Sequence, residues 1–327
     1  KEFFTMITAI DGKPFSEYSM LIGDFDFSRY VLKISHVPEQ ADSGPSLFVV
    51  RVPQIIAGFP AHLFNTPVRR TALEDLLTRK MALAIEDIAV YDREGVSRRR
   101  LAVAAPGQKI LPRSSLVVTE EFVEARVYVE LPERDGLVSG ESAQDVFFDH
   151  LPAVVNASLI YCNLDEKEVD QFVDLMEDAD QVRQMLPTRG LVSFVGEGTL
   201  LAREGHSDLP DYEDARAFGV AEELSVELDV PNSGAIRGLG VPSGITVILG
   251  SDDSGRREVM RAIAAGIYNH VPGDGREMVI TVPDAVYISS EPGRSVRRVD
   301  IGSFTASAQG GEPVPYTSEE ADARSSQ

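Results

Sequence analysis

The stretch "GITVILGSDDSGRREVMRAIAAGIYNH", residues 244–270, decides which fold this sequence can adopt. An apolar run at 245–249 leads into a loop bounded by Gly250 and Gly255, and a helical pattern of apolar residues follows. A strand, a glycine-bounded loop and the N-terminus of a helix together present backbone N–H groups to a phosphate. We therefore expect 245–249 to be a strand within a sheet, and a helix to begin within about two residues of Gly255.

Both elements are required by this interpretation. If 245–249 lay outside a sheet, or if the helix were absent, the phosphate-loop assignment would lose its structural basis. Helical spacing also predicts the buried face of the helix, which comprises Val259, Met260, Ile263, Ala264 and Ile267.

The residues that follow the second glycine depart from the usual chemistry of such a loop. In phosphate-binding loops that hydrolyse nucleotides, a Lys contacts the β- and γ-phosphates, and the next Ser or Thr binds Mg²⁺. Arg256 and Arg257 occupy these positions here. Arg256 keeps the positive charge, but a planar guanidinium does not substitute freely for a compact ammonium. Arg257 has no hydroxyl, so the protein ligand to Mg²⁺ is lost.

Two acidic residues inside the loop leave its role open. A carboxylate about 5 Å from a phosphate costs about 3 kcal/mol at an effective dielectric near 20, so Asp252 and Asp253 oppose anion binding unless the arginines neutralise them. In the alternative interpretation, these carboxylates occupy the anion site themselves and cap the helix. The candidate nucleotide-binding residues are Gly250, Ser251, Asp252, Asp253, Ser254, Gly255, Arg256 and Arg257.

The bulk composition limits the classes of partner. The 327 residues carry a net charge of −21, which opposes general affinity for the phosphate backbone of nucleic acids. No apolar run approaches the roughly 20 residues of a membrane-spanning helix. The single cysteine, Cys162, cannot form an internal disulfide, and we expect it to be a buried apolar residue of a cytoplasmic protein.

One segment is basic against this acidic background. Residues 92–113 hold six basic and two acidic residues, and Arg98, Arg99 and Arg100 are consecutive. These three arginines are the candidate contacts to RNA or phosphate. The alternative is that they are solvated charges at the edge of a strand, where Lys and Arg are common.

The remaining pattern is typical of an α/β protein. Strands are predicted within 15–55, at 98–105, 115–119, 124–131, 190–196, 222–230 and 277–290, and helices at 71–89, 140–161 and 165–186. Thr71 and Glu74 suit a capping box, and Asp165 suits the start of the last helix. Residues 203–219 are predicted to be a polar loop. The four glycines and two prolines of 231–244 predict turns.

Several long strings show a family resemblance. They include "IDGKPFSEYSMLIGDFDF", "RVPQIIAGFPAHLFNTPVRRTALEDLLTRK" and "GLVSFVGEGTLLAR", then "LDVPNSGAIRGLGVPSGITVILG" and "AIAAGIYNHVPGDGREMVITVPDAVYISSEPGRSV". In these strings the chain resembles the predicted ATPases of the ABC class. The resemblance implies a mixed α+β N-terminal domain at 1–222, followed by a truncated ABC-type P-loop unit at 223–327.

The resemblance also implies a ligand and partners. Members of the family bind and hydrolyse ATP, and some are tied to RNA, which a basic pore in a dimer binds. Residues 250–257 fall on the family's phosphate loop, 300–304 on the segment after "PGRSV", and 321–327 on its signature. The signature, "ADARSSQ", has Ala323 in place of a glycine and gains Asp322 and Arg324.

These departures leave two functions open. The sequence ends before a Walker B strand, so no catalytic residue is assigned and a role for Mg²⁺ is not supported. One function is an ATP-binding protein of the ABC class with weakened or absent hydrolysis. The alternative is a catalytically inactive scaffold, or an RNA-associated binding module, on the same fold.

A few other polar residues have both a structural and a functional interpretation. His270 follows the phosphate-loop helix and is expected to be structural rather than a phosphate contact. Asp274, Arg276 and Glu277 lie in a turn, where solvation and function are equally compatible with the sequence. Arg69 and Arg70 precede a long helix and are expected to pair with Glu74 and Asp75 on that helix rather than to contact a nucleotide or RNA phosphate.

Overall fold

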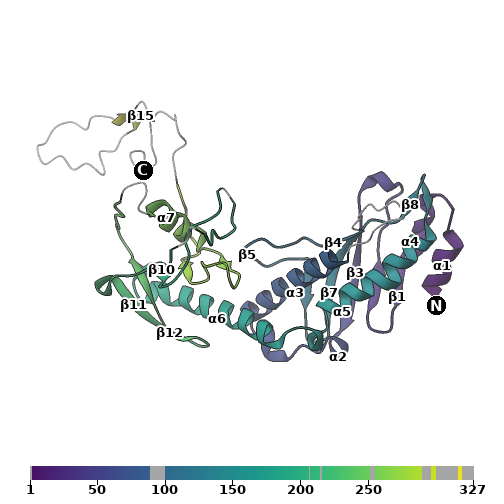
Figure 1. The fold of residues 1–327 in the computed structure, drawn as a ribbon, viewed down its shortest axis with the longest axis horizontal. Coiled ribbons are helices and arrows are strands. Elements are labelled where there is room, and N and C mark those ends of the chain that lie inside the picture. Colours follow the sequence, from purple (N-terminus) through teal and green to yellow (C-terminus); the bar gives the residue numbers. More distant parts are fainter. Residues whose placement is uncertain are drawn as a thin grey trace, which may run out of the picture. The chain divides into compact units, whose positions relative to one another are not determined.

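The computed structural model of the chain describes residues 2–88, 100–205, 207–213, 216–250, 255–288, 296–299 and 316–318 (Figure 1). The chain divides into two compact units, Lys1–Pro283 and Asp284–Gln327. Helices and sheets are mixed along it, which confirms the predicted α/β class. In the second unit, the described residues form one antiparallel pair, β15 (Val296–Val299) with β16 (Tyr316–Ser318).

The first unit opens with an antiparallel sheet in the order β1-β2-β3-β7-β4, with β6 also pairing with β7. Its strands are β1 (Gly23–Asp26), β2 (Val31–Ile34), β3 (Ser46–Pro53), β4 (Leu101–Ala102), β6 (Leu116–Val118) and β7 (Phe122–Val129). Short pairs join β5 (Lys109–Ile110) to β13 (Asn269–His270) and β8 (Glu133–Arg134) to β9 (Leu137–Val138). The strand predictions within 15–55 and at 115–119 and 124–131 are confirmed, except that Phe15–Leu21 is a 3-10 helix. Of the strand predicted at 98–105, the described part forms a strand at Leu101–Ala102 alone.

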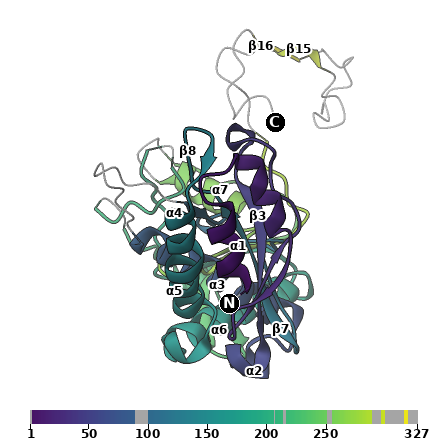
Figure 2. The same cartoon turned by 90° about the vertical axis from the view of Figure 1, so that its right-hand side faces the viewer.

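Helices cover one face of this sheet. They include α1 (Glu2–Ile10), α2 (Gln54–Ala57), α3 (Pro67–Asp87), α4 (Gly140–Gln144) and α5 (Leu151–Ser158), with the π-helical segment Asp145–His150 between the last two. Figures 1 and 2 show α3, α4 and α5 lying on the same side of β3 and β7. The apolar faces of helices and sheet meet there and form the main core.

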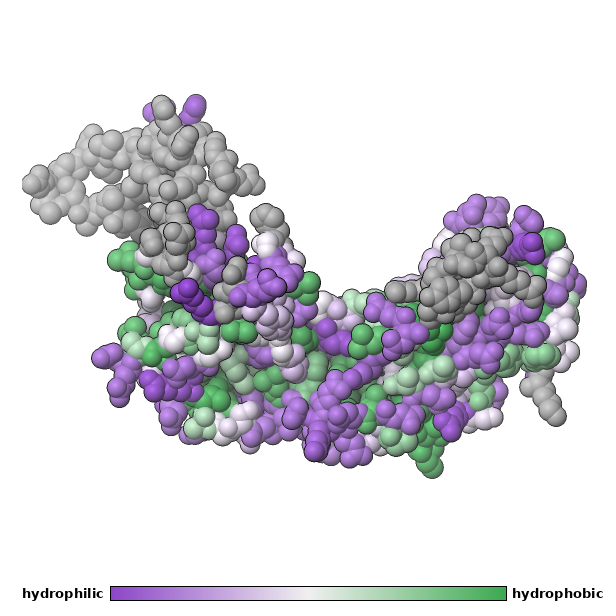
Figure 3. Space-filling view, in the orientation of Figure 1, coloured by the Kyte–Doolittle hydropathy of each residue, from purple (hydrophilic) through white to green (hydrophobic). Residues whose placement is uncertain are grey.

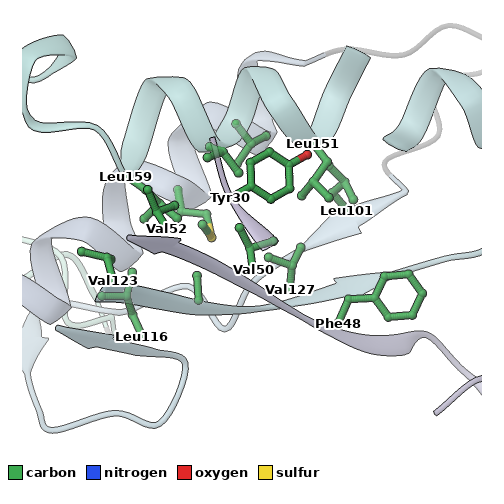
Figure 4. Packing of buried hydrophobic residues seen from close by; sticks show 14 of the residues in the cluster. Tyr30, Phe48, Val50, Val52, Leu101, Leu116, Val123, Val127, Leu151 and Leu159 are labelled. Carbon is green, nitrogen blue, oxygen red and sulfur yellow. The ribbon is translucent and has the colours of Figure 1, made fainter. Parts of the chain in front are cut away.

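Alternation along the central strands builds that core. In β3, every second residue from Ser46 to Val52 is buried, because successive side chains of a strand point to opposite faces. Val50 and Val52 of β3 lie near Leu116 and Val123, with Leu151 and Leu159 above them (Figure 4). The period-two pattern therefore determines which face of the sheet the helices cover.

The start of α3 differs from the predicted capping box. Thr66 is the N-cap: its Oγ1 accepts a hydrogen bond from Arg69 N at 3.2 Å, and Pro67 is the first helical residue. Thr71 therefore lies inside the helix. The Glu74 carboxylate accepts a hydrogen bond from Val118 N at 2.9 Å, which ties the helix to β6. Burial raises the pKa of Glu74.

Helix α6 (Glu166–Thr188) contributes to two cores. Val169 and Met176 pack in the main core, whereas Val182 and Leu186 pack in a second core with the following sheet. Its predicted start is confirmed, since Asp165 accepts hydrogen bonds from the N–H groups of residues 167 and 168. One continuous helix thus connects the two packed regions.

Arg69 joins α3 to α6. Its guanidinium donates to Asp174 at 2.9 Å and to Glu177 at 2.6 Å, and its Nε donates to the carbonyl oxygen of His62. The predicted pairing with acids on its own helix is wrong. The partners lie on another element because the N-terminus of α3 packs against the middle of α6.

The second sheet has the order β11-β12-β10-β14 and is antiparallel at each pairing. Its strands are β10 (Leu191–Gly196), β11 (Ser225–Val230), β12 (Gly234–Pro242) and β14 (Val279–Thr281). The strand prediction at 190–196 is confirmed, and the one at 222–230 is confirmed for Ser225–Val230, whereas Glu222–Leu224 is a 3-10 helix. Residues 231–244 were expected to be turns, and this is wrong for most of them, because β12 continues the β11 hairpin into the centre of the sheet.

The glycines of β12 are needed for packing, which explains the error. A Cβ at Gly238 would lie 2.4 Å from the carbonyl oxygen of Val195 and 2.6 Å from the Phe194 ring. A Cβ at Gly240 would lie 3.0 Å from Leu191 and Val226. Because these glycines have no Cβ, neighbouring side chains and backbone can pack directly against the backbone of β12.

Figure 3 shows hydrophilic residues over much of one face, interspersed with smaller hydrophobic areas. Cys162 lies on the surface, so the expectation that it is buried is wrong. It follows the short helix α5 within the 3-10 turn Tyr161–Asn163. Within the described residues, none of the helices combines the length and apolar character that crossing a membrane requires.

Gly238→Ala should destabilise the second sheet. The added methyl group meets backbone and an aromatic ring closer than real Cβ contacts allow, so we expect the free energy of unfolding to fall by about 1–3 kcal/mol. Gly219→Ala is the matched control, because a Cβ there meets no atom within 4 Å. Urea denaturation of both variants checks the prediction, and equal losses of stability would contradict it.

Candidate functional site

The strand expected before the phosphate loop is absent, which corrects the prediction. Residues 245–250 form neither helix nor strand. Ile245 is 98% exposed and Leu249 is 86% exposed, although both are apolar. Among the described strands, none takes this segment as a neighbour in a sheet. An apolar segment becomes a buried strand only when partners satisfy its backbone on both sides, so the local geometry does not support the phosphate-loop assignment at this point.

The helix after the loop is confirmed. Helix α7 (Arg256–Ala265) begins directly after Gly255, whose φ of 75° lies in the left-handed region that glycine tolerates. Val259 and Ile263 pack against the small core formed with Val195. The predicted buried face is partly wrong: Met260 is 38% exposed, Ile267 lies beyond the end of the helix, and Ala262 is its fully buried residue.

The loop itself is described at its two ends. Gly250 and 255–257 are described, whereas Ser251, Asp252, Asp253 and Ser254 lie outside the described residues. Arg256 Nη1 donates a hydrogen bond to the carbonyl oxygen of Gly250 at 2.8 Å. The contact joins the first residue of the helix to the first residue of the loop. The guanidinium that replaces the phosphate-binding Lys thus directs one N–H group toward the chain's own backbone.

The opposite end of α7 is held by an arginine that the sequence analysis did not identify. Arg183 of α6 donates to Asn269 Oδ1 at 2.6 Å, to Gly266 O at 3.0 Å and to Thr281 O at 3.2 Å. Thr281 Oγ1 in turn donates to Ile263 O at 2.6 Å. Burial lowers the pKa of Arg183. These hydrogen bonds of Arg183 fix the C-terminal end of α7 beside β14. They therefore also position the loop at the other end of α7.

A buried polar cluster lies in the turn after β13. The Asp274 carboxylate lies 2.6 Å from Arg203 Nη2 and 2.8 Å from His270 Nδ1. His270 is 3% exposed, which favours its structural interpretation. Asp274 and Arg276 are also buried, so the solvated interpretation of these two residues is wrong. Burial, followed by the charge of Arg203, lowers the pKa of Arg276 to about 10.

The sequence carried a signal for this cluster. Gly273 and Gly275 have φ values of 83° and 80°, and such a turn folds the chain back on itself. A Cβ at Gly275 would meet Leu200 at 2.7 Å, so the turn packs tightly against the loop that carries Arg203. An Asp between two glycines in the sequence therefore indicated a tight turn at this position. Glu277 accepts a hydrogen bond from Gly273 N and closes it.

The basic segment is partly used in internal ion pairs. Lys109 Nζ lies 3.1 Å from Asp208, and Arg113 Nε lies 3.3 Å from the fully buried Asp75. Arg98 and Arg99 lie outside the described residues. Arg100 is half-buried, and its carbonyl oxygen accepts a hydrogen bond from the backbone N–H of residue 130. Of the three candidate arginines, Arg100 is thus the one that the structure describes.

Other predicted positions also fall outside the described residues. These are the segment 300–304 and the signature stretch 321–327. Within the part of the chain that is described, no group of three His, Cys, Asp or Glu side chains is placed to hold a metal ion.

Comparison with a curated protein gives one similarity of limited extent. The uncharacterized protein MJ1628 of Methanocaldococcus jannaschii is 28% identical over 136 residues, which cover 39% of this chain and 28% of that protein. The match therefore spans less than a third of that protein's length.

Two family models match nearly the whole chain. One, described as the N-terminal part of the ATPase of the ABC class, matches residues 1–162. The other, described as the P-loop domain of ABC ATPases, matches residues 165–326, and this range includes the loop at 250–257. The P-loop assignment therefore rests on the family match and on α7, not on the segment before the loop. The chain belongs to the ATPases of the ABC class, with an N-terminal domain followed by a P-loop domain.

Proposed function

We propose that this chain binds ATP weakly through residues 250–257 and that its Mg²⁺-dependent hydrolysis is weak or absent. The family match supports a nucleotide-binding scaffold. The proposal that binding and hydrolysis are weak rests on one contact: Arg256 Nη1 donates a hydrogen bond to the carbonyl oxygen of Gly250 at 2.8 Å. At the position where the family has a phosphate-binding Lys, this chain has a side chain that bonds to its own loop.

The charges around the loop support weak rather than tight binding. Arg256 and Arg257 are cations at the N-terminus of α7, where the helix dipole also favours an anion. Asp252 and Asp253 add two negative charges to the same short loop. The sum is close to neutral, so the loop lacks the strong positive potential that holds a triphosphate.

The changes in the loop should weaken Mg²⁺ binding more than nucleotide binding. In P-loop proteins, the hydroxyl after the Lys coordinates Mg²⁺, and the metal neutralises charge that develops on the γ-phosphate. Arg257 cannot coordinate a metal ion. Mg²⁺ should therefore add little to nucleotide affinity, and hydrolysis should lose the charge neutralisation that the metal supplies.

We expect the unmodified chain to hydrolyse ATP far more slowly than about 1 per second, an ordinary enzyme rate. ATP should bind about equally well with Mg²⁺ and with EDTA. Isothermal titration and a phosphate-release assay measure the two quantities. Turnover at about 1 per second or above with Mg²⁺ would contradict the proposal.

Substitutions in the loop separate charge from metal binding. Replacing both aspartates, Asp252→Gly with Asp253→Gly, should strengthen ATP binding about tenfold or more, because repulsion is removed. Adding Arg256→Lys and Arg257→Ser should introduce a dependence on Mg²⁺. Arg261→Lys, on the exposed side of the same helix, is the matched control and should change neither property. Weaker binding by the double glycine variant would mean that the carboxylates shape the site.

The alternative function is a scaffold or an RNA-associated module, including a homodimer with a shared basic surface. Lys109 and Arg113 are in ion pairs with Asp208 and Asp75, so an RNA contact would depend on Arg98, Arg99 and Arg100.

A domain boundary after residue 222 is also a proposal, and limited proteolysis tests it.

RNA binding should be weak at physiological salt. Three arginine contacts to a single strand predict that log affinity falls with log salt with a slope of about −2. Fluorescence anisotropy with a labelled single-stranded RNA measures this slope, and replacing Arg98, Arg99 and Arg100 by Gln should abolish it. Tight binding that does not depend on salt would disagree with the charge distribution.

A further inference from the structure

Helix α7 has little apolar packing of its own. It has ten residues, and isolated helices shorter than about 12–15 residues are marginally stable in water. Among these ten residues, Ala262 is the fully buried one, whereas Val259 and Ile263 are partly buried against the small core that includes Val195. Its N-cap residue, Gly255, has no side chain to cap the first turn. Stable folding of α7 therefore depends on contacts at its other end.

The C-terminal end of α7 lies in a polar socket, which consists of Arg183 from α6 together with Asn269 and Thr281. Arg183 Nη2 and the backbone N–H of Thr281 both donate to Gly266 O, at 3.0 and 2.9 Å, and Thr281 Oγ1 donates to Ile263 O at 2.6 Å. The last carbonyl groups of a helix have no partner inside the helix. The socket supplies donors for these groups.

Arg183 contributes both hydrogen bonds and charge to the socket. Its Nε, Nη1 and Nη2 atoms each donate to a different acceptor, namely Thr281 O, Asn269 Oδ1 and Gly266 O. Its positive charge lies at the negative end of the α7 dipole, whereas the positive end of the dipole faces the loop at 250–257. Removing the guanidinium would take one donor from each of three acceptors and leave the dipole without its cation.

Close contact with β14 restricts where α7 ends. A Cβ at Gly266 would lie 2.8 Å from Thr281 Oγ1 and 2.8 Å from Val279 O, which is closer than real Cβ contacts allow. Thr281 is buried, and its hydroxyl also lies 3.0 Å from Ser193 Oγ. The socket therefore accepts the end of α7 in one position, and a larger residue at 266 would push the helix away.

We propose that Arg183 is a positioning residue that keeps α7 folded, and that a nucleotide stabilises the same folded helix from its opposite end. This inference rests on the proposed binding of ATP by residues 250–257. In the folded helix, the N–H groups of the first turn point toward an anion placed at the loop. Local unfolding of α7 takes these N–H groups away, so the loop binds a nucleotide only while the helix is folded.

The two ends of α7 are therefore coupled, beyond the fixed position that the socket gives to the helix. A ligand that binds only the folded form of a segment shifts its local unfolding equilibrium toward that form. Arg183 touches no ligand and acts through the helix alone.

Amide hydrogen exchange of the whole chain, followed by NMR, measures this local equilibrium. Arg183→Gln should speed the exchange of residues 257–266 at least about tenfold and leave the amides of β3 and β7 unchanged, because those strands report global unfolding. Arg189→Gln is the matched control: it removes the same charge from an exposed position at the end of α6 and should leave exchange in α7 unchanged.

A second variant tests the socket without changing any charge. Gly266→Ala introduces the methyl group that β14 does not accommodate, so it should also speed exchange in 257–265, although alanine favours a helix more than glycine does. This variant decides the result if Arg183→Gln does not fold. Failure of both variants to fold would mean that the socket stabilises the whole unit, and it would overturn the proposal.

The same amides report the effect of ATP on the wild-type chain. ATP at about ten times its dissociation constant should slow their exchange about tenfold. The proposal is overturned if calorimetry detects ATP binding without this slowing. It is also overturned if Arg183→Gln speeds exchange equally in α7, β3 and β7, or in none of them. If ATP does not bind at all, the proposed function and the coupling both fail, whereas exchange in the free chain still decides whether Arg183 keeps α7 folded.

Discussion

Apolar packing along helix α6 is the constraint on which the rest of the first unit depends. The first half of the helix fills the main core through Val169 and Met176, and its second half fills another core through Val182 and Leu186. Polar side chains on the same helix then fix its neighbours. Arg183 holds the end of α7, and Asp178 accepts hydrogen bonds from Asn232 N and Ser233 N in the β11–β12 turn.

The candidate nucleotide site depends on this packing from a distance. The loop at 250–257 precedes α7, α7 lies against β14, and both are bonded to Arg183. The family match supplies the P-loop scaffold, whereas the altered side chains in the loop belong to this sequence. The fold that places the loop and the side chains that would bind a ligand can therefore change independently, because packing keeps the loop in position whatever side chains it carries.

Local patterns predicted much of the fold. Alternation identified β3 and β7, and helical spacing with an acidic N-terminus identified α6. Errors arose where the role of a residue depends on distant neighbours. Gly238 resembled a turn residue, but the ring of Phe194 and the backbone of β10 require a glycine in that strand.

The same reason limits what could be predicted of the site. The helix after Gly255 follows from local sequence, and it was predicted correctly. The segment 245–249 has the composition of a strand, but strand formation requires hydrogen-bonding partners that composition does not specify. Arg183 and Arg203 escaped notice because nothing near them in the sequence indicates which carbonyl or carboxylate they meet.

The short pairing of β5 with β13 has a consequence for how the chain folds. Asn269 pairs with Ile110, and Val271 N donates to Gln108 O, so a segment of the N-terminal half completes the turn after α7. Contacts between segments so far apart in sequence form slowly, because the intervening chain must first be ordered. During synthesis, the N-terminal sheet can therefore fold early, whereas the region that carries the loop reaches its final packing only after the β5 arm is in place.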